Sequence, residues 1–411
     1  MRPKRKRRRM RRATRKRGAT DAMKEFFARF KYLNPLLLAC MIGLTVIGVM
    51  FVYSACSIRE DPDLQLLYLR HAEVGLFGLA LYFAMAWFDF RPFLRLGWLF
   101  YAASLVLLAL VLVIGEETMG ARRWLFGIQP SEPAKLAIIL VLAWLYGRRE
   151  ADRGAGTFFL TAVIVGVPCA LILLQPDLGT TMALVPTVLA MMFAANVAPR
   201  LLWTCVIGGL LAVTVVLGIV YAAERMDLPQ GKRDALIRAT CLRPHQIKRL
   251  EVFLFPDKDL HGSGYNRRQS EIAVGSGGAW GKGYLKGEQY MLGYLPPSIS
   301  SNDFIFSVLA EEAGFAGSVT VLLLFLGLLG SGLWVAFQCQ DDMGRLFCVG
   351  VVSLIFSHMF INIAMTIGIM PITGLPLPFI SYGRTFMLTM MAALGLVQSV
   401  SIHGREPESR F

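Results

Sequence analysis

The chain has 411 residues, of which 55% are hydrophobic and only 17% are charged. Soluble globular domains usually carry about 25% charged residues, so this composition excludes an ordinary soluble enzyme. Long apolar segments recur along the whole chain, and we expect an all-α polytopic membrane protein.

The basic excess is concentrated at the N-terminus. The formal net charge is +14, and residues 1–33 hold fifteen Lys or Arg against two acidic residues. Such a run can bind nucleic acid, but beside a membrane segment it is more typical of a disordered cytoplasmic tail that sets orientation. We expect residues 1–33 to be this tail and predict no nucleic-acid partner.

Apolar segments of near-spanning length predict a bundle of about ten transmembrane helices. In chain order their approximate bounds are 35–55, 72–89, 95–114, 133–147, 157–174, 180–197, 200–222, 304–335, 346–369 and 377–401. With the basic tail inside, ten spans place both termini in the cytoplasm, the second as a short tail at 403–411. The transmembrane domain is then residues 34–402, and residues 223–303 form one large extracytoplasmic loop.

The unusual polar motifs all fall on the outer side of this topology. They are "MGARRWLFGIQPSEPAK" (119–135), "QPDLGTT" (175–181), the large loop, and the proline-rich "PITGLPLPFISYG" (371–383). The proline-rich segment predicts a non-helical re-entrant, which is tolerated at membrane depth only where protein or water satisfies its backbone. The motifs together indicate a substrate site that faces away from cytoplasmic nucleotides.

Three acids lie where an otherwise apolar helix begins, in "SSNDFIFSVLAEEAG" (300–314). Asp303, at the mouth of this helix, could be only a helix cap. Glu311 would lie about 80° around the helix from Asp303, and Glu312 about 180°. Because carboxylates at membrane depth usually face a cavity, Asp303 and Glu311 suggest a proton acceptor, a cation site, or both.

Basic side chains gather on the same side. Arg122, Arg123 and Lys135 surround the loop before the fourth helix, and Lys282 and Lys286 lie in the glycine-rich "GSGGAWGKGYLKGEQ". Glycine backbone amides and lysines together suit a phosphate-bearing ligand. The equally weighted alternative is that these side chains only extend to lipid headgroups.

These motifs resemble the SEDS family of shape, elongation, division and sporulation proteins, and are most similar to its RodA branch. The resemblance covers residues 34 to 401 and is carried by "QPSEPAK", "QPDLGTT", "GYNRRQSEIAVGSGGAWGKGYLKGEQ", "DFIFSVLAEEAGFAG" and "PITGLPLPFISYG". It implies a peptidoglycan glycosyltransferase for cell-shape elongation, which polymerises lipid II, an undecaprenyl-diphosphate-linked disaccharide peptide, outside the bacterial cytoplasmic membrane. It also implies a class B penicillin-binding protein as partner, and Asp303 as the essential catalytic aspartate.

The motifs and the resemblance together define a candidate site. We expect Asp303 to be the base of an inverting displacement, and Asp303 with Glu311 to hold a divalent cation, Mg²⁺ or Mn²⁺. The substrate-binding candidates are Arg122, Arg123, Gln129, Glu132, Lys135, Lys282, Lys286, Gln289 and Arg384.

Several positions differ from the family pattern. The family's "SYGGS" reads "SYGRT" here, with Arg384, and the family's "LPExHTDFIF" reads "LPPSISSNDFIF". The arginine that RodA-type members carry before "QPSE" is absent, since Gly127 and Ile128 stand there. Arg384 is therefore a candidate for a relocated anion-binding charge, the alternative being a headgroup contact.

Two other functions fit a membrane bundle with internal acids. A lipid II flippase would use ten spans and broken helices, but the sequence shows no matching inner gate or inverted repeat. A non-catalytic scaffold for a transpeptidase would tolerate the altered residues before Asp303.

Overall fold

The computed structural model describes residues 32–57, 62–118, 121–148, 153–226, 244–259 and 262–405, with the single residues 231, 240 and 242. The expected basic tail therefore lies almost wholly outside the described residues, as does most of the expected C-terminal tail. Every candidate site residue lies within them.

Within the described residues, ten long helices form the bundle, one for each predicted span. They are α2 (Pro35–Cys56), α4 (Leu67–Trp87), α6 (Gly97–Ile114), α7 (Ser131–Tyr146), α8 (Ala155–Leu174), α9 (Leu178–Ala194), α10 (Pro199–Arg225), α16 (Ile305–Gln338), α17 (Asp342–Thr366) and α18 (Arg384–His403). Seven of them, all but α4, α7 and α9, are long and apolar enough to cross a membrane alone. The predicted all-helical polytopic fold is confirmed.

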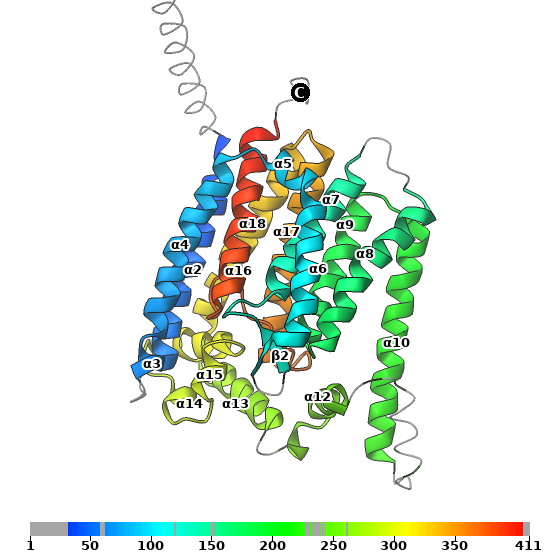
Figure 1. The fold of residues 1–411 in the computed structure, drawn as a ribbon. Helices are drawn as coiled ribbons and strands as arrows, with labels where there is room; N and C mark the ends of the chain where they lie inside the picture. Colours follow the sequence, from blue (N-terminus) through cyan, green and yellow to red (C-terminus); the bar gives the residue numbers. More distant parts are fainter. Residues whose placement is uncertain are drawn as a thin grey trace, which may run out of the picture.

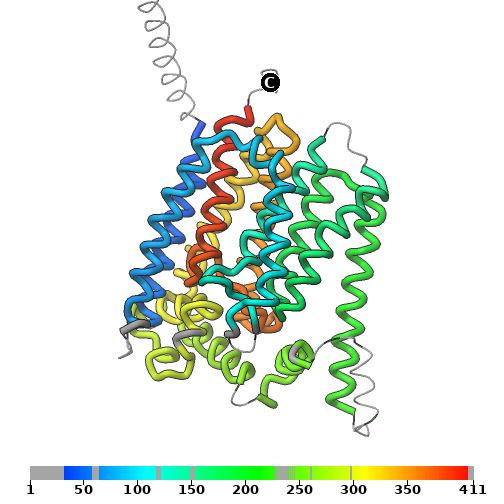
Figure 2. The backbone as a smooth tube through the Cα atoms, viewed as in Figure 1, coloured from blue at the N-terminus to red at the C-terminus, as the bar shows by residue number. Residues whose placement is uncertain are grey.

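Helices α17 and α18 occupy the centre of the bundle, and α10 stands at its edge (Figure 1, Figure 2). In the most apolar part of each helix, 72% of the residues of α17 and 78% of those of α18 are buried, against 6% for α10. Helix α18 packs along α4, while α17 packs against α7, α9 and α16. The central pair is therefore where polar side chains are shielded from lipid.

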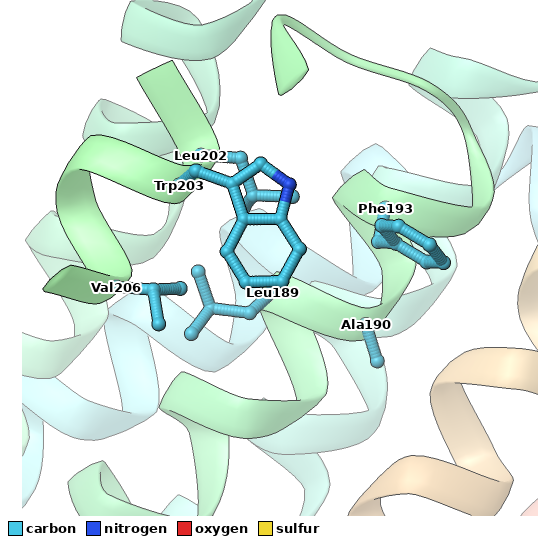
Figure 3. Close-up of a pocket in the computed structure, with 6 residues that line it drawn as sticks. All are labelled: Leu189, Ala190, Phe193, Leu202, Trp203 and Val206. Atoms are coloured by element: carbon cyan, nitrogen blue, oxygen red, sulfur yellow. The ribbon is translucent and has the colours of Figure 1, made fainter. Parts of the chain in front are cut away.

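A small apolar groove separates α9 from α10, as Figure 3 shows. Its volume is about 300 Å³, and it is lined by Leu189, Ala190, Phe193, Leu202, Trp203 and Val206. None of these side chains ionises, so the groove offers lipid-like surface rather than a reactive group.

One end of the bundle is covered by a layer of short helices from the expected large loop, here named the cap layer. Its elements are α12 (Pro244–Leu254), the 3₁₀-helix η2 (Pro256–Lys258), α13 (Ser263–Ser276), α14 (Glu288–Met291) and α15 (Pro297–Ser300). Helix α13 packs against α16 and α17. The described chain ends, at residues 32 and 405, lie at the opposite end of the bundle (Figure 1). Two short helices join spans: α3 (Pro62–Gln65) and α5 (Phe90–Arg95).

Two non-helical segments also lie at the cap end. Strands β1 (Glu116–Thr118) and β2 (Ala121–Trp124) pair antiparallel, a hairpin that the sequence did not predict. Residues 369–383 form the expected non-helical re-entrant with Pro371, Pro376 and Pro378, so the predicted start of the last helix at 377 was wrong. Proline restricts its own backbone and that of the preceding residue, which delays the helix to Arg384.

Candidate active site

A cavity of about 450 Å³ opens between the hairpin, the cap layer and the re-entrant. Its wall is built from β2, the first turns of α7, α9 and α18, α12, the turn before α16, and the re-entrant. The charged lining residues are Arg123, Glu132, Asp177, Arg249, Asp303 and Arg384. Segments more than 250 residues apart in sequence therefore meet in one polar space.

Asp303 precedes α16 and faces this cavity. Its carboxylate does not cap the helix, because the N-cap position is Phe304 and no side-chain capping bond is present there. Burial raises the pKa of Asp303 to about 6, although Arg249 and Arg123 oppose the rise. A carboxylate with a pKa near 6 is well suited to accept a proton near neutral pH.

Three arginines share the cavity but differ in how firmly they are held. Arg123 donates to the carbonyls of Gln175, at 3.1 Å, and of Pro176. Arg249 of α12 donates to the carbonyl of Thr373 at 3.3 Å. The exposed side chain of Arg384 has no hydrogen bond or ion pair with any residue that the structure describes. Its guanidinium is the least committed of the three.

Arg384 lies against the position where the expected arginine is missing. A Cβ added to Gly127 would stand 3.7 Å from Nη2 of Arg384. Two chain segments 257 residues apart thus approach the same point of the cavity mouth. This placement is what a relocated positive charge requires.

Gln129 and Glu132 line the cavity as well, and each is fixed by a neighbour. The Gln129 amide donates to Asp177 at 3.3 Å, and Asp177 in turn caps α9 through the backbone of Thr180 at 3.1 Å. Glu132 accepts a hydrogen bond from Lys135 at 3.0 Å. Lys135 itself is fully buried beneath Glu132, so it supports the wall without lining it.

The other basic candidates do not line the cavity. Arg122 and Lys286 are exposed, and Lys282 is paired with Glu288 at 3.0 Å and with Glu311 at 2.8 Å. Gln289 donates its backbone N–H to the Glu311 carboxylate. These four residues therefore do not line the cavity that Asp303 faces, and their role in substrate binding stays a prediction.

The glycine-rich segment packs against α16, and its backbone N–H groups donate to groups of that helix. The N–H groups of Lys282 and Gly283 donate to the carbonyls of Glu311 and Glu312, both at 3.0 Å. In return Phe315 donates to the carbonyl of Gly278 at 2.9 Å. These bonds satisfy backbone groups that are freed where Gly314 (φ 66°) breaks the helix.

The expected cation pair of Asp303 and Glu311 is not assembled. The Glu311 carboxylate is completely buried with Lys282, and it does not line the cavity. Among the described residues no three His, Cys, Asp or Glu side chains are grouped as metal ligands. Mg²⁺, however, often needs only one or two carboxylates when substrate phosphates complete its shell, and Asp303 fits that requirement.

Residues 34–406 match the protein family described as cell cycle protein, FtsW/RodA/SpoVE. This chain belongs to the FtsW/RodA/SpoVE family. It is 34% identical to peptidoglycan glycosyltransferase RodA of Treponema pallidum, over 89% of this chain and 96% of that protein. It is 32% identical to peptidoglycan glycosyltransferase MrdB of Escherichia coli K12, over 90% and 94%.

A solved structure supports the same assignment. The fold superposes with a TM-score of 0.71 and 29% identity on a chain from a study of how a peptidoglycan synthase complex coordinates polymerization and crosslinking. The match covers 90% of this family member and 97% of that chain. The likeness therefore extends over nine-tenths of this chain.

Sequence reasoning missed two charged residues of the cavity in this family member. Asp177 lies in "QPDLGTT", a motif that was singled out without assigning its acid a role. Arg249 lies in the large loop, where only the amphipathic run "IKRLEVFLF" could have indicated a helix with a basic side chain. The sequence alone does not show that Asp177 and Arg249 line the same cavity as Asp303.

Proposed function

We propose that this peptidoglycan glycosyltransferase joins lipid II units in the Asp303 cavity, with Asp303 as the general base. The observation that carries the proposal is the convergence of one proton-accepting carboxylate and three arginines in one open polar space. A base beside several fixed positive charges suits a reaction that removes a proton from a hydroxyl and releases an anionic leaving group.

The proposed step is a single displacement. Asp303 takes the proton of the acceptor sugar hydroxyl as its oxygen attacks the anomeric carbon of the donor. The bond from that carbon to the diphosphate oxygen breaks, and undecaprenyl diphosphate leaves with its electron pair. Attack opposite the leaving group inverts the anomeric centre, so no covalent enzyme intermediate forms.

The three arginines of the cavity have different proposed roles. Arg249 and Arg384 are available to the diphosphate, while Arg123 is tied by two backbone carbonyls and mainly shapes the wall. The charge of Glu132 is balanced by Lys135, so the cavity remains net positive. A Mg²⁺ or Mn²⁺ ion would be held by Asp303 and the diphosphate oxygens, and would further stabilise the leaving group.

Orientation and partner follow from the same proposal. The cavity end is proposed to face the outside of the cytoplasmic membrane, because the fifteen Lys or Arg among residues 1–33 favour a cytoplasmic N-terminus and the described chain begins at the opposite end of the bundle. Polymerised glycan would then be passed to a class B penicillin-binding protein for crosslinking. The related chain from a synthase complex that couples polymerization and crosslinking supports this partner.

Polymerisation of labelled lipid II by the purified protein in detergent tests the proposal. Glycan strands from the wild type, and at least about 100-fold less from Asp303→Asn, are expected. Transfer of lipid II across vesicles without polymer would favour the flippase. Failure of the folded protein to make polymer with or without a transpeptidase would favour the scaffold.

A further inference from the structure

Helix α17 places two buried polar side chains under the cavity, although neither lines it. Asn362 and His358 are both fully buried and lie four residues apart, hence on one face of the helix. Polar groups inside a membrane bundle are costly and are usually paired with a functional partner. Their contacts lead to two different parts of the cavity wall.

Asn362 joins the catalytic turn to the re-entrant. Its amide nitrogen donates to the backbone carbonyl of Asp303 at 2.9 Å and to that of Leu375 at 2.7 Å. Both partners are acceptors, so only the NH₂ group can face them, which fixes the orientation of the amide. Asn362 therefore links the main chain of Asp303 itself to the proline-rich segment, next to the bond that Ser381 donates to the carbonyl of Asn302 at 2.6 Å.

His358 joins a different part of the wall. Its Nε2 lies 2.9 Å from Nζ of Lys135, which also contacts Glu132 at 2.9 Å. An ammonium group has only donors, so Nε2 must accept and the ring proton resides on Nδ1. The carbonyl of Pro376 lies near the ring, and Nδ1 makes no hydrogen bond within the part of the chain that the structure describes.

We propose that Asn362 and His358 are positioning residues for glycosyl transfer. Asn362 holds the main chain of Asp303 against the re-entrant, and His358 holds Lys135 so that Glu132 points into the cavity. This inference rests on the proposed function of Asp303. A displacement of about 1 Å of a catalytic group can cost about 100-fold in rate, so these two contacts should control turnover.

The test for Asn362 uses an isosteric change. Asn362→Asp replaces the donating nitrogen by an oxygen of the same size, and Asn362→Leu removes both polar atoms. Each should lower kcat for lipid II polymerisation about 10- to 100-fold, with KM changed less than about threefold. Ser357→Ala is the matched control, because Ser357 is buried on the same helix but bonds only to Ser353 of that helix.

The test for His358 is rescue by a residue that keeps the acceptor. Gln can present its carbonyl oxygen to Lys135, whereas Leu cannot. His358→Leu should lose about 10-fold or more in kcat, and His358→Gln should stay within about threefold of the wild type. Equal loss in both variants would show that the ring only fills space, and would overturn the role of His358.

A readout independent of polymerisation separates this inference from the proposed function. The rate at which a water-soluble carbodiimide labels Asp303, measured by peptide mass spectrometry, should change at least about fivefold in Asn362→Asp but not in Ser357→Ala. Unchanged labelling and unchanged kcat in Asn362→Asp would overturn the positioning role. Changed labelling in a protein whose wild type makes no polymer would sink the proposed function and would keep only the claim that Asn362 positions the Asp303 carboxylate.

Discussion

At the scale of single residues, Asp303 differs from the other acids at the cap end by what surrounds it. Glu311 is neutralised by Lys282, and Glu312 accepts from Ser54 at 2.6 Å and from Tyr290. Asp303 alone combines an open cavity with a pKa raised to about 6. Among the described acids that line the cavity, Glu132 and Asp177 are held by neighbouring side chains, so we propose Asp303 for proton transfer.

Asp303→Asn should abolish most of the activity while leaving the fold intact. The amide keeps the size of the side chain but cannot accept a proton, so polymerisation should fall at least about 100-fold. The measurement is lipid II turnover by protein that elutes normally on size exclusion. Near-normal polymer would reduce Asp303 to a wall residue.

The pH dependence of polymerisation should carry the signature of Asp303. The base acts when deprotonated, so kcat/KM should decrease as the pH falls through about 6, approaching a tenfold loss per pH unit at lower pH. The residual activity of Asp303→Asn should lack this acid limb. An acid limb centred near pH 4 in the wild type would contradict the burial of Asp303.

Arg384 provides a test of the relocated charge. Arg384→Ala should weaken lipid II turnover about 10- to 100-fold, as expected when a charged donor to a transition-state anion is lost. Arg384→Gly should be equally weak. Adding Gly127→Arg should restore activity, because a Cβ at position 127 would stand 3.7 Å from where Nη2 of Arg384 lies. A fully active Arg384→Gly single variant would leave Arg384 as a headgroup contact.

At the scale of elements, the helix bundle could be predicted from the sequence, whereas the cap layer and the hairpin could not. Ten apolar runs identify ten helices because each must satisfy its own backbone in lipid. The prolines within 371–383 likewise predict the non-helical re-entrant. The cap-layer helices and the hairpin lack long apolar runs, so no comparable signal marks them in the sequence.

The misplaced residues have a common physical cause. The helical periodicity of 300–314 predicted that Glu311 lies about 80° around the helix from Asp303. It could not show that the loop carrying Lys282 folds against α16 and forms an ion pair with Glu311. The periodicity also assumes a straight helix, whereas α16 breaks at Gly314. The periodicity of one helix cannot predict which side chains from a distant segment of the chain will contact it.

The junction between the glycine-rich segment and α16 should be sensitive to a single methyl group. Gly281 has φ 77°, and an added Cβ would lie 2.0 Å from the carbonyl oxygen of Glu312. Gly281→Ala should cost about 1–3 kcal/mol and lower the thermal unfolding midpoint in detergent. Gly275→Ala is the control, since nothing lies within 4 Å of its added Cβ. Equal midpoints would show that the junction is loose.

At the scale of the whole molecule, the basic tail and the catalytic cavity should be separable. Deleting residues 2–20 removes most of the positive excess but keeps Lys24, Arg29 and Lys31 beside α2. The deleted protein should insert with the same orientation and polymerise lipid II at a rate within about threefold of the wild type. Loss of all activity from folded, purified protein would give the tail a role in catalysis.

The wall of the cavity joins β2, near the first third of the chain, to the first turn of α18, near its end. Chains enter the membrane from the N-terminus onward as they are synthesised. No growing chain that lacks α18 has Arg384 or the closing side of the wall. The capacity to capture a lipid-linked sugar thus appears only when translation is nearly complete, and a truncated product has no partial version of it.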